Sequence, residues 1–354
     1  MEKLAKRVQK LQDQLLAKQW FLVNDRKNVS YLSGFTGTSG YVLVSKNKGY
    51  FLTDFRYTEQ AKLQCPHLEV VTHEQIVWDT IASLTQGAEV LFVEESHMTL
   101  EHYNQLSEKV KAEVKGSKNL VEDLRIVKDG DEIALIKEAA RITDEAFEEI
   151  CAIIKPGVTE LELARELEFR MKKKGASHVA FDFIVASGKR GALPHGVATD
   201  KVIEAGELVT FDIGAVYKGY HSDMTRTVAV GTISSQLQEI YEIVLTAQKE
   251  ALNAVEAGKT GYEIDKVARD IISEAGYGEY FGHGLGHGVG LDIHEEPRVS
   301  PNGKTVLKQN MVITIEPGIY LPGVGGVRIE DLVVVETTGA TRLSLSSKEL
   351  IVLC

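Results

Sequence analysis

Residues 209–223 read VTFDIGAVYKGYHSD and place two acidic residues, Asp212 and Asp223, in a stretch that otherwise predicts a β-hairpin. With Lys218-Gly219 as the two-residue turn, Asp223 faces position 214 and lies diagonal to Asp212 on one side of the hairpin. Two carboxylates this close would force one to keep its proton unless a metal ion compensates both charges. Taken alone, the pair also fits two solvated acids on a hairpin.

Two further acids and a histidine extend this pattern. Glu316 ends the apolar run 312–315, and Glu330 follows Val-Arg-Ile at 327–329. A carboxylate inside an apolar strand is costly to remove from water, so these acids indicate a bound cation. Residues 281–290 read FGHGLGHGVG. The alternating glycines allow the backbone to approach a ligand closely and leave the imidazoles of His283 and His287 projecting from it. One of the two is expected to be a ligand and the other an orienting group, although each alone also fits a structural or surface histidine.

The same glycine-rich segment excludes two other classes of site. Its spacing does not match G-x-G-x-x-G, and no Walker lysine follows it, so it is not a dinucleotide or phosphate loop. So many glycines disfavour the helix of an H-E-x-x-H zinc site, and the glutamate of that motif is absent.

Composition bounds the protein class. A chain of 354 residues with 44% hydrophobic and 26% charged residues suggests about two globular domains. The net charge of −11 argues against nucleic acid or an anionic membrane as partner. Residues 1–20 lack the apolar core of a signal peptide, and no run approaches a membrane span. Cys65, Cys151 and Cys354 have neither CxxC spacing nor a disulfide framework, so we expect reduced thiols and a cytoplasmic location.

The chain is expected to divide within residues 120–131, into an α/β domain over 1–125 and a larger domain over 126–354. In the first, helical stretches alternate with β-like runs at 41–44, 50–53 and 90–93. In the second, helices are predicted over 132–155, 159–174, 235–255 and 260–275. A helix pair precedes acid-bearing strands twice, which predicts an α+β domain of two related halves. Two unrelated helix-then-sheet stretches are the alternative.

Six motifs together resemble one enzyme family. They are Pro194-His195-Gly196, Asp212 with Asp223, Gly284-Leu285-Gly286-His287, His294-Glu295-Glu296-Pro297, Glu316-Pro317-Gly318-Ile319-Tyr320 and Val327-Arg328-Ile329-Glu330-Asp331. Their order resembles the creatinase-like "pita-bread" metallopeptidases, and most of all the proline-specific branch of Xaa-Pro dipeptidases (prolidases) and Xaa-Pro aminopeptidases. The resemblance covers residues 131–354, and the first 120 or so residues resemble that branch's smaller N-terminal α/β domain.

The resemblance implies a metal centre and the residues around it. Asp212 would chelate one of two divalent metal ions, Asp223 and Glu330 would bridge both, and His287 and Glu316 would complete the site. Mn²⁺ suits this carboxylate-rich set best, and Co²⁺ or Zn²⁺ is also compatible. Glu316 would act as the base that takes a proton from the water held between the metals. His195 and His294 would bind substrate and stabilise the developing negative charge, Arg298 would grip the substrate carboxylate, and His283, Tyr320 and Arg328 would support the ligands.

The resemblance further implies hydrolysis of the peptide bond that precedes proline. Small peptides with proline in second position are the expected substrates, with dipeptides favoured because Arg298 resembles a carboxylate-binding arginine. Xaa-Pro aminopeptidase activity on longer peptides is the alternative, and a non-catalytic peptide-binding or protein-binding member of the fold is a more remote one. Methionine aminopeptidases share the ligands but usually lack the N-terminal domain, and creatinases lack the ligands. The resemblance also implies a homodimer.

Overall fold

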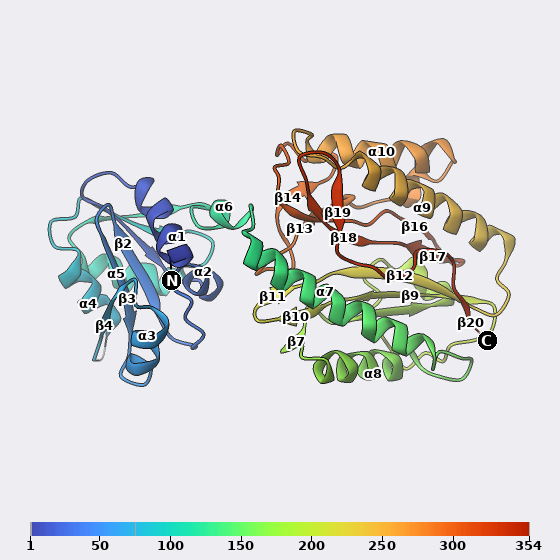
Figure 1. Cartoon of the computed structure of the whole chain (residues 1–354), viewed down its shortest axis with the longest axis horizontal. Helices are drawn as coiled ribbons and strands as arrows, with labels where there is room; N and C mark the ends of the chain where they lie inside the picture. The colour runs from blue at the N-terminus through green and yellow to red at the C-terminus, as the bar shows by residue number, and fades with distance from the viewer. Residues whose placement is uncertain (1, 75, 354) are drawn as a thin grey trace. The chain divides into compact units, whose positions relative to one another are not determined.

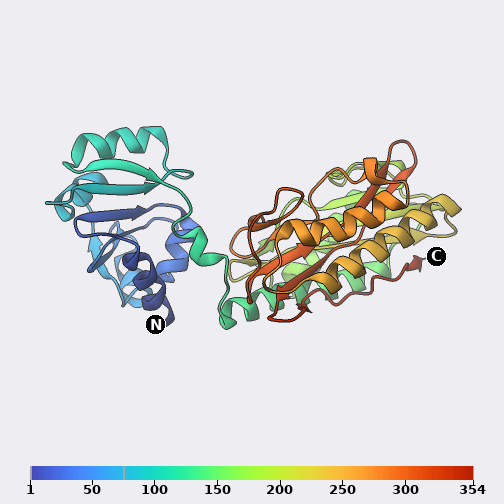
Figure 2. The ribbon, with the colours of Figure 1, turned by 90° about the horizontal axis from the view of Figure 1, so that it is seen from above.

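The computed structural model describes residues 2–74 and 76–353 (Figures 1 and 2). Contacts divide the chain into two compact units, Met1–Arg125 and Ile126–Cys354. Each unit has its own hydrophobic core, as expected of an independent domain. Within the described residues, no helix is long and apolar enough to cross a membrane. Cys65 and Cys151 are free thiols, and Cys354 lies outside the described residues.

The N-terminal unit is a six-stranded sheet covered by helices. The sheet order is β4-β3-β2-β1-β5-β6, in which β1, β2 and β3 pair antiparallel and the other pairs are parallel. The three predicted β-like runs are confirmed as parts of β2, β3 and β5. The strands are β1 (Gln19–Val23), β2 (Tyr41–Ser45), β3 (Lys48–Thr53), β4 (Glu69–Thr72), β5 (Val90–Glu94) and β6 (Glu113–Ser117). The helices are α1 (Glu2–Asp13), α2 (Arg26–Ser33), α3 (Thr58–Gln64), α4 (Val77–Leu84), α5 (Leu100–Lys109) and α6 (Glu122–Arg125).

In the C-terminal unit, the described residues form two helix pairs and four small sheets. The helices are α7 (Gly130–Cys151), α8 (Glu160–Lys173), α9 (Ser235–Ala254) and α10 (Gly261–Glu274), with short 3-10 turns η1 (Gly188–Ala192) and η2 (Gly278–Tyr280). The strands of the first half are β7 (His178–Val179), β8 (Ile184–Ser187), β9 (Glu207–Ile213), β10 (Ala215–Tyr217), β11 (Tyr220–His221) and β12 (Met224–Val230). Those that follow are β13 (Gly286–Gly288), β14 (Glu295–Val299), β15 (Val312–Ile315), β16 (Gly318–Leu321), β17 (Gly325–Arg328), β18 (Asp331–Val335), β19 (Ala340–Arg342) and β20 (Val352–Leu353).

One helix boundary differs from the sequence prediction. The helix expected over 132–155 ends at Cys151. Ile154 is 2% exposed and packs in the core of the first half, so the chain has already turned inward there. Pro156 also disfavours helical backbone at the residue before it. The other three predicted helices agree with α8, α9 and α10 to within two residues.

The two halves of this unit repeat one local design, which confirms the mixed α+β fold of related halves. Thr159 caps α8 and Thr260 caps α10, each in a capping box with the glutamate three residues later. Each threonine also forms an isolated β-bridge, to Val202 and Val306 respectively. One core lies between α7, α8 and strands β8, β9 and β12, and the other lies under α9 and α10. Figure 1 shows the two helix pairs on opposite sides of the strands.

The expected hairpin is present at residues 209–230. Thr225 pairs with Asp212 and Met224 with Ile213, so Asp223 continues the register opposite Gly214 as predicted. Lys218 and Gly219 form the turn with φ of 48° and 88°. Positive φ at both central positions is typical of the tight hairpin turn whose twist matches its strands. The register therefore directs Asp212 and Asp223 to one side.

Candidate metal centre and active site

All five expected ligands line one cavity of about 770 Å³ in the C-terminal unit. Asp212 lies in β9 and Asp223 just before β12, so the first half supplies two carboxylates. His287 lies in β13, Glu316 directly follows β15, and Glu330 lies between β17 and β18. Strand ends from both halves therefore deliver the acids and the imidazole to the same space.

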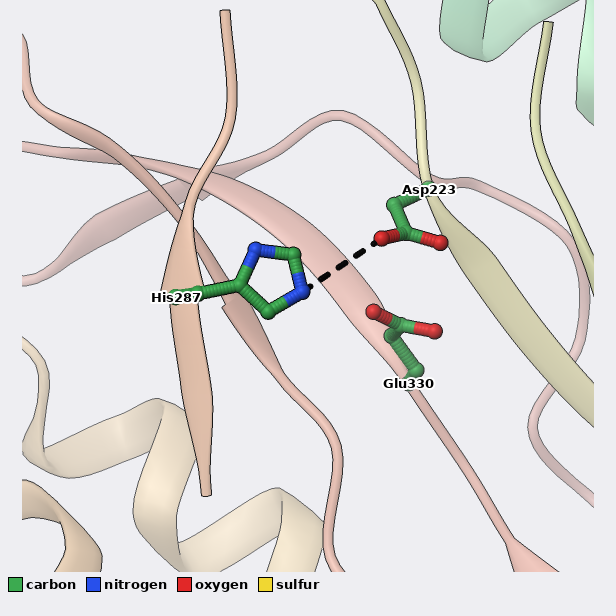
Figure 3. A group of neighbouring side chains, drawn as sticks. All are labelled: Asp223, His287 and Glu330. Carbon is green, nitrogen blue, oxygen red and sulfur yellow. Dashed lines mark ion pairs between the residues drawn. The ribbon is translucent and has the colours of Figure 1, made fainter. Parts of the chain in front are cut away.

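Three of the five residues come close enough to share one ion. Ligand atoms of Asp223, His287 and Glu330 all lie within 4.8 Å of one another, and Figure 3 shows these side chains converging from separate segments. His287 Nε2 lies 3.6 Å from Asp223 Oδ2 and 3.4 Å from Glu316 Oε1. Asp212 lines the same cavity, with Oδ2 held 2.6 Å from Arg328 Nη2.

The electrostatics of this cluster fit a divalent cation. Burial, followed by the charges of Glu330 and Asp212, raises the pKa of Asp223 well above its usual range. Burial and the Glu316 charge do the same to the pKa of Glu330, and burial raises the pKa of Glu316 to about 8. Glu330 Oε1 is buried without a hydrogen-bond partner among the described residues. A cation beside these oxygens would remove the repulsion and supply the missing partner.

The His287 imidazole is oriented as a neutral ligand. Its Nδ1 lies 3.1 Å from the carbonyl oxygen of Gly288, a contact that fits an Nδ1–H donor and leaves the Nε2 lone pair facing the acids. Burial, followed by the neighbouring His294, lowers the pKa of His287 to about 3. Its backbone N–H donates to Thr314 Oγ1 at 3.1 Å, and the same hydroxyl donates to Glu316 Oε1 at 3.2 Å.

Glycines bring the strands of this region together. A Cβ atom at Gly286 would lie 2.0 Å from the carbonyl oxygen of Thr314, and one at Gly288 would lie 2.2 Å from that of Glu296. Neither position therefore tolerates a side chain without moving a neighbouring strand. The alternating glycines thus serve the approach of β13 to β14 and β15, in addition to lining the cavity.

Arg328 organises the wall behind Asp212. Arg328 is 3% exposed. Its guanidinium donates to Asp212 Oδ2 at 2.6 Å, to the Tyr320 hydroxyl at 2.8 Å and to Thr225 Oγ1 at 3.1 Å. The Tyr320 hydroxyl also lies 2.8 Å from His283 Nε2, and burial lowers the pKa of His283 to about 4. A neutral His283 can accept a hydrogen bond from the Tyr320 hydroxyl. His283, Tyr320 and Arg328 therefore form one hydrogen-bonded chain that ends at Asp212.

Three further predicted residues line the cavity from loops and strand β14. His195 follows η1, and His294 precedes β14 with its ring centroid 4.3 Å from that of His287. Arg298 pairs with His287 in the antiparallel ladder of β13 and β14, so both side chains emerge on the same face. Burial, followed by the charge of Arg298, lowers the pKa of His294.

Several contributing residues escaped the sequence prediction. Thr225 donates to Glu330 Oε2 at 2.7 Å, and Thr314 contacts both His287 and Glu316. Each threonine lies two residues from a proposed ligand, so the period-two alternation of a strand could have identified both. The sequence prediction also missed the apolar part of the wall, which comes from the start of β8 and from loops without such a pattern; it consists of Phe181, Ile184, Pro194, Val197 and Ile293.

Comparison with known proteins identifies relatives of both units. Residues 134–337 match the model of metallopeptidase family M24, and residues 7–127 match the creatinase/prolidase N-terminal domain. An Xaa-Pro dipeptidase from Pyrococcus furiosus is 46% identical over 92% of this chain and 92% of its own length. The structure of an Xaa-Pro dipeptidase from Bacillus anthracis superposes with a TM-score of 0.97 at 48% identity, over 99% of this chain and 100% of that one. That of an X-Pro aminopeptidase from Thermotoga maritima gives 0.91 at 40% identity, over 97% and 99%.

Proposed function

Because the chain belongs to metallopeptidase family M24 and carries the creatinase/prolidase N-terminal domain, we propose that it hydrolyses the peptide bond preceding proline in Xaa-Pro dipeptides. The observation that carries the dipeptide assignment is the position of Arg298. Arg298 in β14 is paired with His287 in the neighbouring strand β13, and both residues line the same cavity. The Arg298 guanidinium therefore faces the space beside the candidate metal ligands. The dipeptidases from Pyrococcus furiosus and Bacillus anthracis support the proline-specific part.

The proposed metal site holds two divalent ions. They would be held by Asp212, Asp223, His287, Glu316 and Glu330, which line one cavity. When bound, the ions lower the pKa of a water molecule and polarise the scissile carbonyl. The carboxylate-rich donor set with a single imidazole favours Mn²⁺, with Co²⁺ or Zn²⁺ as alternatives.

The protein groups perform the proton transfer and stabilise charge. Glu316 accepts the proton of the attacking water, and its contact with the Thr314 hydroxyl fixes the carboxylate for that transfer. His195 and His294 line the cavity and would donate hydrogen bonds to the carbonyl oxygen as negative charge develops on it. Arg328 keeps Asp212 in place by donating to its Oδ2, and the Tyr320 hydroxyl, which accepts from the same guanidinium, fixes the orientation of Arg328.

Arg298 would set the preferred peptide length. The bond before proline is a tertiary amide with no N–H, so recognition has to use other groups of the substrate. The Arg298 side chain is 53% exposed and forms a long, exposed ion pair with Glu296, with 4.0 Å between Nε and Oε1, which a substrate carboxylate could replace. Its guanidinium can therefore bind the terminal carboxylate of a dipeptide through charge-assisted hydrogen bonds.

An Xaa-Pro aminopeptidase that accepts longer peptides is the second candidate. A cavity of about 770 Å³ is larger than a dipeptide requires, and the aminopeptidase from Thermotoga maritima is among the relatives. A side-by-side assay of Ala-Pro, Met-Pro and an Ala-Pro-Xaa tripeptide, each with Mn²⁺, Co²⁺ and Zn²⁺, separates the two. Faster turnover of the tripeptide would reject the dipeptidase assignment, and no cleavage of any Xaa-Pro bond would reject both.

Replacing Arg298 by alanine tests the carboxylate contact directly. The kcat/KM for Ala-Pro is expected to fall roughly 10- to 100-fold, the range for losing a hydrogen bond to a charged group. The tripeptide, whose carboxylate lies one residue further away, is expected to lose much less. Arg165→Ala, which removes an exposed arginine of α8 outside the cavity, is the matched control. Equal losses for both peptides would contradict the proposed contact.

Replacing Glu316 by glutamine tests catalysis against a peptide-binding role without hydrolysis. The variant is expected to bind substrate but to lose hydrolysis by two to four orders of magnitude, roughly the contribution of a general base. Near-normal turnover would contradict the role of Glu316.

We also propose that the protein is a homodimer located in the cytoplasm. Light scattering during size-exclusion chromatography measures the oligomeric state.

A further inference from the structure

Glu160 is a buried carboxylate outside the cavity that gathers hydrogen bonds from one loop. It is the first residue of α8 and is 0% exposed. Its Oε1 accepts hydrogen bonds from the backbone N–H and the hydroxyl of Ser187, both at 2.8 Å. Its Oε2 accepts from the backbone N–H of Thr199 at 3.1 Å, from the Thr199 hydroxyl at 2.9 Å, and from Arg190 Nη1. The loss of this charge would leave several buried donors without an acceptor.

These donors bracket residues 188–198, the loop that carries His195. Ser187 lies immediately before the loop and Thr199 immediately after it, so Glu160 ties its two ends together. Arg190 links Glu160 to the second half of the loop, because its Nη1 contacts Glu160 while its Nη2 donates to the carbonyl oxygen of Val197 at 2.8 Å. The hydrogen bonds from Glu160 through Arg190 thus reach Val197, two residues after His195.

The loop is also attached to the metal-ligand side of the cavity. The carbonyl oxygen of Pro194 accepts a hydrogen bond from Arg328 Nη1 at 3.3 Å, and Arg328 holds Asp212. Gly191 packs so closely on Gly326 that a Cβ there would lie 3.1 Å from the Gly326 nitrogen. The backbone that precedes His195 is therefore held at a defined distance from β17.

The imidazole of His195 has no comparable attachment of its own. It is exposed and lines the cavity, and within residues 2–74 and 76–353 it forms no hydrogen bond or ion pair. His294, in contrast, packs its ring on that of His287 with centroids 4.3 Å apart. The contacts of the loop therefore fix the His195 backbone, from which the side chain reaches the cavity.

We propose that Glu160, acting through Arg190 and the two loop ends, is a positioning residue that holds His195 in place for hydrolysis. Glu160 does not line the cavity, so its contribution is indirect and passes through the segments that it contacts, of which the loop carries His195. This inference rests on the proposed role of His195 in the reaction. A displacement of about 1 Å at a reacting group can lower the rate by roughly 100-fold, so a remote carboxylate can control turnover.

A double-mutant cycle between Glu160→Gln and His195→Ala tests the coupling. Glutamine keeps the size of the side chain but removes the charge and replaces one acceptor oxygen by a donor. We expect His195→Ala to lower kcat for Ala-Pro on the order of 100-fold, and Glu160→Gln to lower it by about tenfold. In the His195→Ala background, Glu160→Gln should cause a further loss of less than about twofold, because its effect has already been removed.

Arg190→Gln provides a second route if Glu160→Gln folds poorly, because Arg190 is partly exposed at 23% of its side chain. It should give the same non-additive pattern with His195→Ala. Glu162→Gln is the matched control, since Glu162 belongs to the same helix turn but its carboxylate accepts hydrogen bonds from the Thr159 backbone N–H and hydroxyl rather than from the loop. This control should leave kcat unchanged. Metal content should remain that of the unaltered protein in all variants, because no ligand contacts Glu160.

The outcomes separate this inference from the proposed function. Non-additive losses in the cycle support the positioning role, and kcat should fall more than KM rises. Losses that multiply in the double variant, or full activity of both Glu160→Gln and Arg190→Gln, would overturn the inference while leaving the peptidase assignment intact. Normal hydrolysis by His195→Ala would overturn the proposed role of His195 and this inference with it.

Discussion

Removing the metal ions should reverse the way in which the stability of the catalytic unit depends on pH. In the metal-free site, the pKa of Glu316 is about 8, against an ordinary value of 4.5 that also describes the unfolded chain. Between these two values the folded protein binds more protons than the unfolded chain. Because stability changes with pH as the difference in bound protons, the free energy of unfolding of the metal-free protein falls as pH rises from about 4.5 to 8.

The size of this effect follows from the shift. At 1.36 kcal/mol per pKa unit, the Glu316 shift corresponds to at most about 5 kcal/mol, and relaxation and water entry reduce it to roughly 2–3 kcal/mol. The raised pKa values of Asp223 and Glu330 act in the same direction. For a domain of this size, 1 kcal/mol shifts the melting temperature by about 2–4 °C, so a fall of about 5–10 °C is expected between pH 5 and 8.

Metal saturation should give the opposite trend, because bound cations keep the carboxylates ionised in the folded state and compete with protons. Differential scanning calorimetry of chelator-treated and Mn²⁺-saturated protein over this range measures both curves. The two tryptophans, Trp20 and Trp78, lie in the N-terminal unit, so their fluorescence follows that unit separately. Glu316→Gln should flatten the metal-free curve, since glutamine does not titrate. A metal-free protein whose melting temperature stays level or rises from pH 5 to 8, parallel to the saturated sample, would refute the reasoning.

Three further substitutions are expected to have distinct effects. Asp331→Asn removes the 0% exposed carboxylate that pairs with Arg226 at 2.7 Å. It should lower the free energy of unfolding, measured by denaturant titration, by about 3–5 kcal/mol. A loss below about 1 kcal/mol would contradict this expectation. Thr225→Val removes the hydroxyl that donates to Glu330, and should weaken Mn²⁺ binding by roughly 10- to 100-fold in calorimetric titrations, with unchanged affinity as the contrary result. Burial raises the pKa of Glu94 to about 7 from 4.5, so stability of the N-terminal unit should fall as pH rises between these values. Glu94→Gln should flatten that trend in the tryptophan fluorescence melting curve, and an unaltered slope would argue against it.

Most of the architecture was accessible from local patterns. The hairpin at 209–223 was predicted down to its turn and register, because alternation and a Lys-Gly turn are properties of neighbouring residues. The end of α7 was missed by four residues, since the buried position of Ile154 depends on packing from distant strands. The repeat of the two halves was visible only weakly in sequence, although the two threonine capping boxes at 159 and 260 could have strengthened it.

The sequence by itself identified candidate metal ligands, because acids inside apolar strands and histidines among glycines are local anomalies that a bound cation would explain. Only the tertiary structure decided which of them meet. Asp223, His287 and Glu330 come from segments far apart in the chain, and their shifted pKa values arise from shared burial and mutual repulsion. The link from Glu160 through Arg190 to the His195 loop has no motif either, because a hydrogen bond network depends on the distance between folded segments.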